Sequence, residues 1–153
     1  MARCWLVKSE PDCYSFDQLV ADGRTAWEGV RNYQARNYMR DDMRVGDLVL
    51  YYHSSTAVPA VVGIAKVASQ PYPDATQFDP DNEYYDPKAT EAAPRWFLVD
   101  LEPVRSLPRP VTLEELRADP DLAGMQLLAR GNRLSVMPVE AEHAARIQEL
   151  AAA

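Results

Sequence analysis

The fold class is decided by the stretch Leu48-Val-Leu-Tyr-Tyr-His53 together with the stretch Ala60-Val-Val-Gly-Ile-Ala-Lys-Val67. Both are runs of β-branched and aromatic residues, a composition that is typical of β-strands. Only the loop Ser54–Pro59 separates them, so we expect the two strands to pair in antiparallel fashion.

Three further strands are predicted, one before this pair in the sequence and two after it. Trp5-Leu-Val-Lys8 is a short buried strand that ends before Pro11, because proline lacks the N–H that a strand ladder needs. Arg95–Glu102 is a strand with Pro103 near its end, and Arg133–Val136 is a closing strand.

Short helices are predicted in the connections. Ser15-Phe-Asp-Gln18 has the form of a capping box and opens a helix through Val20, which Gly23 stops. Thr112-Leu-Glu-Glu115 is a second capping box, for a helix that ends near Asp119-Pro120. The spacing of apolar residues predicts three more helices, over Gln34–Met43, Leu122–Ala129 and Val139–Leu150. This order predicts an α+β fold, a mixed β-barrel with helices outside it.

Length and composition predict a single domain over residues 1–153. There is no run of about 18 apolar residues and no signal peptide pattern, so a cytoplasmic protein without a membrane contact is expected. Cys4 and Cys13 are too few for a disulfide framework and lack nearby histidines, so we expect reduced thiols and no metal. No motif indicates a cofactor.

The net charge of −7 argues against a protein that coats a nucleic-acid backbone. Basic residues are nevertheless concentrated in one segment, and we expect Arg31, Arg36 and Arg40 to contact phosphates. The alternative for Arg36, Arg40 and Arg44 is a solvated helix face. The long segment Pro71–Pro94, rich in Pro, Asp and Tyr, is predicted to be a binding loop.

Aromatic and polar residues occur together in four clusters, at strand ends or in loops: Lys8–Pro11, Trp27–Tyr33, Tyr51–Ser54 and Tyr84–Pro87. Trp27 and a tyrosine are suited to stacking on an unpaired base, and neighbouring polar groups are suited to reading its edge. The alternative is that Trp27 and Tyr52 fill the core. His53 with Lys8 and Glu10 forms a conceivable hydrolytic set, but no catalytic motif supports an enzyme.

The same clusters carry a resemblance to a known family. The stretches concerned are Trp5–Pro11, Trp27–Asn37, Met43–Asp47, Tyr52–Ser54, Val62–Ala65, Tyr72–Asp74, Gln77–Asp79, Tyr84–Lys88, Pro94–Trp96 and Arg133–Val136. In these stretches the sequence resembles the EVE domain family. Glu28 departs from the family's motif, in which an aspartate is common at this position.

The resemblance implies a PUA-like pseudo-barrel, similar to YTH domains, with a pocket for a flipped or unpaired base. It implies DNA or RNA carrying a modified base, with modified cytosine foremost, as the partner of a non-catalytic module. The pocket residues that it implies are Lys8, Ser9, Glu10, Trp27, Val30, Arg31, Asn32, Tyr52, His53, Ser54 and Ser135.

Two other functions stay open from the sequence. One is a nucleobase-processing enzyme like the amidohydrolases of the ASCH group, which would use Lys8 and Glu10; the other is a protein-interaction adaptor. For a module that binds a base, we expect the largest polar cavity to be lined by Trp27, Tyr52, His53 and residues 8–10, with Arg31 at its mouth.

Overall fold

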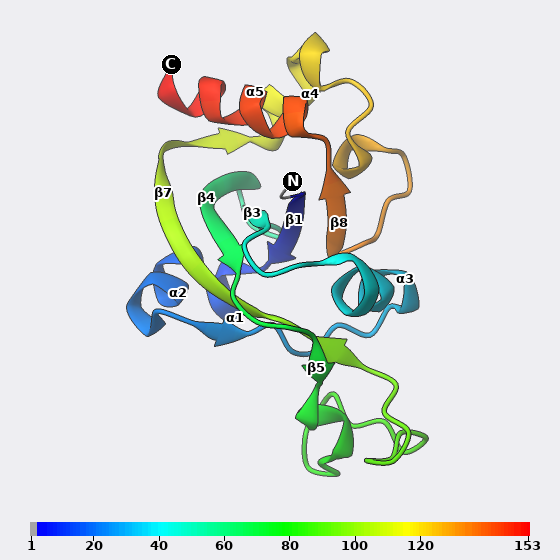
Figure 1. Cartoon of the computed structure of the whole chain (residues 1–153). Coiled ribbons are helices and arrows are strands. Elements are labelled where there is room, and N and C mark those ends of the chain that lie inside the picture. Colours follow the sequence, from blue (N-terminus) through cyan, green and yellow to red (C-terminus); the bar gives the residue numbers. More distant parts are fainter. Residues whose placement is uncertain (1–2) are drawn as a thin grey trace.

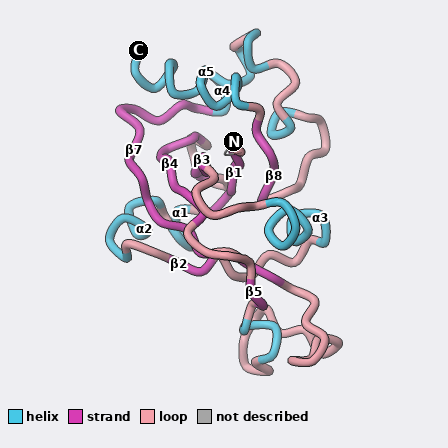
Figure 2. The backbone as a smooth tube through the Cα atoms, viewed as in Figure 1, coloured by secondary structure: helices cyan, strands magenta, loops and turns pink. Residues whose placement is uncertain are grey.

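The computed structural model describes residues 3–153. Its main feature is a six-stranded sheet that curls around an apolar interior (Figures 1 and 2), with the strand order β2-β7-β4-β3-β1-β8. β1 and β3 are parallel and the other neighbours are antiparallel. The strands are β1 (Cys4–Ser9), β2 (Thr25–Ala26), β3 (Leu48–His53), β4 (Ala60–Val67), β7 (Asp100–Thr112) and β8 (Val136–Val139).

The curled sheet confirms the predicted fold class and the predicted antiparallel pair β3–β4. Val7, Val49, Ile64 and Val99, one from each of four predicted strand segments, are all buried in one hydrophobic core. α4 (Leu113–Ala118) and α5 (Ala141–Ala152) lie together at the top of Figure 1, and α1 (Pro11–Tyr14) and α2 (Phe16–Asp22) lie beside the lower part of β7. None of the helices in residues 3–153 is long and apolar enough to cross a membrane.

The prediction that a strand ends near Pro103 is wrong, because β7 continues to Thr112. Pro108 and Pro110 fall where the pairing with β4 is interrupted, between the pairs Gly63–Ser106 and Val61–Val111. An irregular register leaves residues of one strand without ladder partners, and proline is tolerated at such places. β7 thereby bends around the sheet as one long strand (Figure 2).

Local capping explains several helix boundaries. The Ser15 hydroxyl accepts a hydrogen bond from the backbone N–H of Gln18, and α2 ends at Gly23, whose φ of 77° suits glycine. The Gln18 side chain donates to Asp22 instead of returning to Ser15, so only half of the predicted capping box forms. α3 (Tyr33–Asn37) continues as a π-helical turn, Tyr38–Asp42.

Two predicted elements near the C-terminus differ from the structure. The helix expected over Leu122–Ala129 is replaced by two 3₁₀ turns, Pro120–Leu122 and Gln126–Leu128. Gly124 lies between them with φ of 93°, a conformation that interrupts a helix. The closing strand begins at Val136, so residues 133–135 approach it as a loop.

The full capping box at Thr112 is expected to stabilise α4 measurably. Its hydroxyl accepts from the backbone N–H of Glu115, and the Glu115 carboxylate accepts from the backbone N–H of Thr112. Thr112→Ala should lower the free energy of unfolding by about 1 kcal/mol in urea denaturation. Thr112→Ser keeps the hydroxyl and should lose much less; equal losses in both variants would contradict a capping role.

The predicted loop Pro71–Pro94 has no long regular element but is tightly organised. β5 (Tyr72–Pro73) pairs with β6 (Phe97–Leu98), and a 3₁₀ turn covers Ala75–Phe78. The buried Gln77 amide donates to the carbonyls of Asp74 and Trp96 and accepts from the N–H groups of Arg95 and Trp96. The amide thus fastens both ends of the loop to each other.

Candidate functional site

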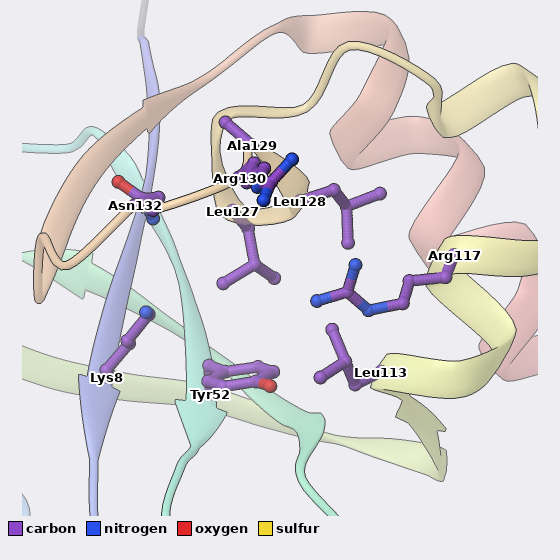
Figure 3. A pocket seen from close by; sticks show the side chains of 10 residues that line it. Lys8, Tyr52, Leu113, Arg117, Leu127, Leu128, Ala129, Arg130 and Asn132 are labelled. Carbon is purple, nitrogen blue, oxygen red and sulfur yellow. The ribbon is translucent and has the colours of Figure 1, made fainter.

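A cavity of about 560 Å³ opens beside the carboxyl ends of β1 and β3 (Figure 3). Its volume lies within the range of ligand pockets. Four segments contribute to it: β1, β3, α4 and the loop that precedes β8. The lining residues are Lys8, Tyr52, Leu113, Arg117, Leu127, Leu128, Ala129, Arg130, Gly131 and Asn132.

The strands place Lys8 and Tyr52 side by side. Lys8 of β1 is in register with Tyr52 of β3, and neighbouring residues in register point to the same face of a sheet. In Figure 3 the Tyr52 ring is seen nearly edge-on below the cavity, so one face of the ring is turned towards Leu127. Burial lowers the pKa of the Lys8 ammonium. It raises the pKa of the Tyr52 phenol, which the charge of Arg117 opposes.

The opposite wall combines apolar and cationic groups. The Arg117 side chain extends from α4 between Leu113 and Leu128 (Figure 3). Arg130 and Asn132 come from the loop above, where Gly131 adopts φ of 77°, a turn conformation that suits glycine. Among the described residues that line the cavity, the charged ones are all cations: Lys8, Arg117 and Arg130.

Within residues 3–153, these cations differ from most others because their side chains have no hydrogen-bonding or ionic partner. Nine arginines donate side-chain hydrogen bonds or form ion pairs within the protein: Arg24, Arg31, Arg36, Arg40, Arg44, Arg95, Arg105, Arg109 and Arg146. Within residues 3–153, the side chains of the remaining cations have no such contact; they are Arg3, Lys8, Lys66, Lys88, Arg117, Arg130 and Arg133. Three of these seven line the cavity.

A second hollow, of about 370 Å³, adjoins the cavity and shares residues 129–132 with it. Arg133 lines only this hollow, together with polar residues from the start of α3. Asn32 caps α3 by accepting from the backbone N–H of Ala35, which leaves its amide NH₂ without a role in the cap. The polar side chains of the second hollow are Asn32, Gln34, Gln126, Arg130, Asn132 and Arg133.

Trp27 does not line either hollow. Its side chain is 9% exposed and belongs to the hydrophobic core, where its ring meets the edge of Tyr51 at 5.5 Å between centroids. Val30 is also a core residue. The expected cavity lining is therefore wrong for Trp27, and contact of Trp27 or Val30 with a base stays a prediction.

His53 is held outside the cavity by the backbone. Its Nε2 accepts a hydrogen bond from the Phe16 N–H at 3.1 Å, and burial lowers the pKa of its imidazole. Ser9, which pairs with His53, donates to the Glu10 carbonyl. Ser54 donates its N–H to the Ser9 carbonyl. These contacts fix the positions of Ser9, His53 and Ser54. Contact of these three residues with a ligand stays a prediction.

The structure also separates Glu10 and Ser135 from the cavity. β1 ends at Ser9, and Glu10 is the exposed N-terminal cap of α1, where its carboxylate accepts from the Cys13 thiol. Lys8 lines the cavity and Glu10 does not, so the predicted lining by residues 8–10 is wrong for Glu10. Ser135 contributes its backbone carbonyl, which accepts from the Lys8 N–H.

Arg31 is engaged inside the protein and not at the cavity mouth. Its guanidinium pairs with Asp74 at 3.1 Å and donates to the Thr76 hydroxyl and the Tyr84 carbonyl. Arg36 donates to the Arg95 carbonyl, and Arg40 to Asp41. These arginines have protein partners already, and their predicted phosphate contacts stay predictions.

Sequence reasoning missed the side of the cavity that α4 and the loop before β8 build. Arg117 and Arg130 stand in segments without aromatic neighbours, and Gly131-Asn132 has a composition that indicates only a turn. The capping box at Thr112 marked the start of α4. It did not reveal that α4 faces β3 across a cavity, because that contact depends on the path of the whole β7 strand.

Comparison with known proteins identifies the family. The EVE domain family matches residues 3–150. Thymocyte nuclear protein 1 of Mus musculus is 38% identical, over 93% of this chain and 70% of that protein. A hypothetical protein from Leishmania major has the same fold, with a TM-score of 0.94, 43% identity and coverage of 99% and 96% of the two chains.

A further solved structure is described as human THYN1 protein in complex with 5-methylcytosine-containing DNA. It superposes with a TM-score of 0.92 at 36% identity, and the match covers 98% of each chain. The sequence resemblance is thus confirmed over nearly the whole length by both sequence and structure. This chain belongs to the EVE domain family.

Proposed function

We propose that this protein is a non-catalytic module that binds a modified cytosine in nucleic acid and holds the base in the cavity between β1, β3, α4 and the loop before β8. Residues 1–153 form one domain in this function. The proposal is supported by the human relative of the same fold, which has been solved with DNA that contains 5-methylcytosine.

The observation that carries the proposal is the lining of the cavity. It offers an aromatic face from Tyr52, apolar side chains from Leu127 and Leu128, and donors from Lys8 and Asn132. Stacking on an aromatic ring binds the face of a base, and hydrogen-bond donors read the acceptors at its edge. The leucines suit an apolar substituent such as a methyl group.

A non-catalytic role fits the distribution of acidic groups. An amidohydrolase-like reaction using Lys8 and Glu10 requires both groups near one substrate atom. Glu10 lies outside the cavity and is occupied with the Cys13 thiol. His53, the other candidate base, accepts the Phe16 N–H with its Nε2. Binding without bond cleavage is therefore the function that this arrangement supports.

The proposal predicts a preference for modified DNA. An oligonucleotide with one 5-methylcytosine should bind at least about tenfold more tightly than the same oligonucleotide with cytosine, because a hydrophobic substituent in a fitted pocket is worth about 1–3 kcal/mol. Fluorescence anisotropy with single- and double-stranded probes measures this ratio. Mass spectrometry of the recovered oligonucleotide should show an unchanged mass. Equal affinities, or a changed mass, would contradict the proposal.

A further inference from the structure

The second hollow beside the base cavity has no role in the binding of a base alone. The two hollows are separated only by the loop that contains residues 129–132, and those residues line both. Arg130 is exposed on this loop and belongs to both hollows, whereas Arg133 belongs only to the second. A ligand that extends out of the cavity across this loop therefore enters the second hollow.

The charge of the second hollow is opposite to that of the molecule. Its charged lining residues within the described chain are Arg130 and Arg133, although the protein as a whole carries −7. Neither guanidinium has a hydrogen-bonding or ionic partner among residues 3–153. In contrast, Arg36 and Arg40 on α3 and its π-helical extension are engaged with the Arg95 carbonyl and Asp41.

The uncharged part of the hollow is also suited to an anion. Asn32, Gln34 and Gln126 contribute side-chain amides, and an amide carries two N–H donors. Gln34 gives one of its two to the Tyr38 hydroxyl. Arginine donors in a planar fork together with amide donors are the groups that bind phosphate oxygens in nucleic-acid complexes. None of the described residues that line this hollow is aromatic, so it offers no ring on which a second base would stack.

We infer that the second hollow is a subsite for the phosphate that links the modified nucleotide to its neighbour, and that Arg130 and Arg133 bind this phosphate. The inference rests on the proposed function, which places the base in the first cavity. The ligand is then a strand that crosses the loop 129–132, and not a free base or nucleoside. The paired residues Lys8 and Tyr52 read the base, while the loop arginines hold the strand.

The test uses three probes with the full chain: the nucleoside 5-methyl-2′-deoxycytidine, a DNA trinucleotide with 5-methylcytosine in the middle, and the same trinucleotide with uncharged methylphosphonate linkages. Calorimetry at low salt should show the natural trinucleotide binding at least about tenfold more tightly than the other two probes.

Arg133→Gln should weaken trinucleotide binding about three- to fivefold and leave nucleoside binding unchanged. The dependence of log K on log salt should become shallower by about 0.7, as expected for one phosphate contact on a single strand.

Lys66→Gln is the matched control, because it removes another exposed cation that has no partner among residues 3–153 and lies on β4 outside both hollows. Lys66→Gln should leave nucleoside binding unchanged and should weaken trinucleotide binding by no more than the general loss of one charge. Equal effects of Arg133→Gln and Lys66→Gln, or full affinity for the methylphosphonate probe, would refute the phosphate subsite while leaving the base cavity intact. Absence of any preference for 5-methylcytosine in the unaltered protein would instead refute the proposed function, and the subsite with it.

Discussion

Tyr52→Ala is expected to weaken binding of a 5-methylcytosine oligonucleotide by about ten- to a hundredfold, because stacking on an aromatic side chain is worth about 1–3 kcal/mol for each base. Tyr52 is the aromatic residue that lines the cavity, and its ring lies below the space that the base would fill (Figure 3). Stacking involves no ionic contact, so the salt dependence of binding should stay nearly constant. Anisotropy titrations at several salt concentrations measure both quantities.

Tyr52→Phe is the matched control for this experiment. It keeps the ring and removes the hydroxyl, so it should retain most of the affinity if the face of the ring is what binds. Tyr52 is only 4% exposed, and thermal denaturation of both variants therefore has to accompany the binding data. Folded Tyr52→Ala protein with unchanged affinity and unchanged preference for the modified base would contradict the placement of the base on Tyr52.

The features predicted correctly from the sequence are those that depend on local rules. The strands β3 and β4 follow from their β-branched and aromatic runs, and the capping box at Thr112 has a fixed spacing within α4. Gly23 ends α2 for an equally local reason, its positive φ. The length of β7 depends instead on its irregular pairing with β4, so the prediction of a strand end near Pro103 is wrong.

The site was only half predictable for the same reason. Lys8 and Tyr52 stand in clusters of polar and aromatic residues, and β1 and β3 place them in register. Trp27 stands in an equally suggestive cluster, yet it is a core residue packed on Tyr51. Sequence composition cannot distinguish an aromatic residue that stacks on a ligand from one that fills the core. That distinction depends on which face of the sheet the neighbouring elements cover.

Arg31 illustrates how a residue expected to bind phosphate can have a structural role. Its guanidinium carbon lies 5.3 Å from the Trp96 ring centroid and 5.4 Å from that of Tyr84, within reach of cation–π attraction. Its ion pair with Asp74 and its bonds to the Tyr84 carbonyl join the segment after Trp27 to the loop Pro71–Pro94. Gly29 allows the close approach, because a Cβ there would lie 2.6 Å from the Tyr84 ring.

Asp74 is at the centre of the contacts that join the segment after Trp27 to the loop Pro71–Pro94. Its side chain is 1% exposed and accepts hydrogen bonds from the Gly29 N–H at 2.8 Å, the Thr76 N–H at 2.9 Å and the Thr76 hydroxyl, besides the Arg31 guanidinium. Burial by itself would raise the pKa of the Asp74 carboxyl. The bonds from Thr76, Gly29 and Arg31 outweigh burial and hold this pKa below its ordinary value.

Asp74→Ala should therefore lower the free energy of unfolding by about 3–5 kcal/mol, because it leaves Arg31 without its buried counterion and removes the acceptor of several hydrogen bonds. Asp81→Ala, at an exposed position in the same loop, should change the free energy of unfolding by less than about 0.5 kcal/mol.

A carboxyl whose pKa is depressed on folding stabilises the native state above its unfolded pKa, here near 3.8. That contribution disappears as the pH falls from this value through the lower folded pKa. Urea denaturation between pH 7 and pH 2 should consequently show that the unaltered protein loses stability more steeply on acidification than Asp74→Asn, which cannot titrate at this position. Parallel pH profiles of the two proteins would show that the Asp74 carboxylate does not hold the loop.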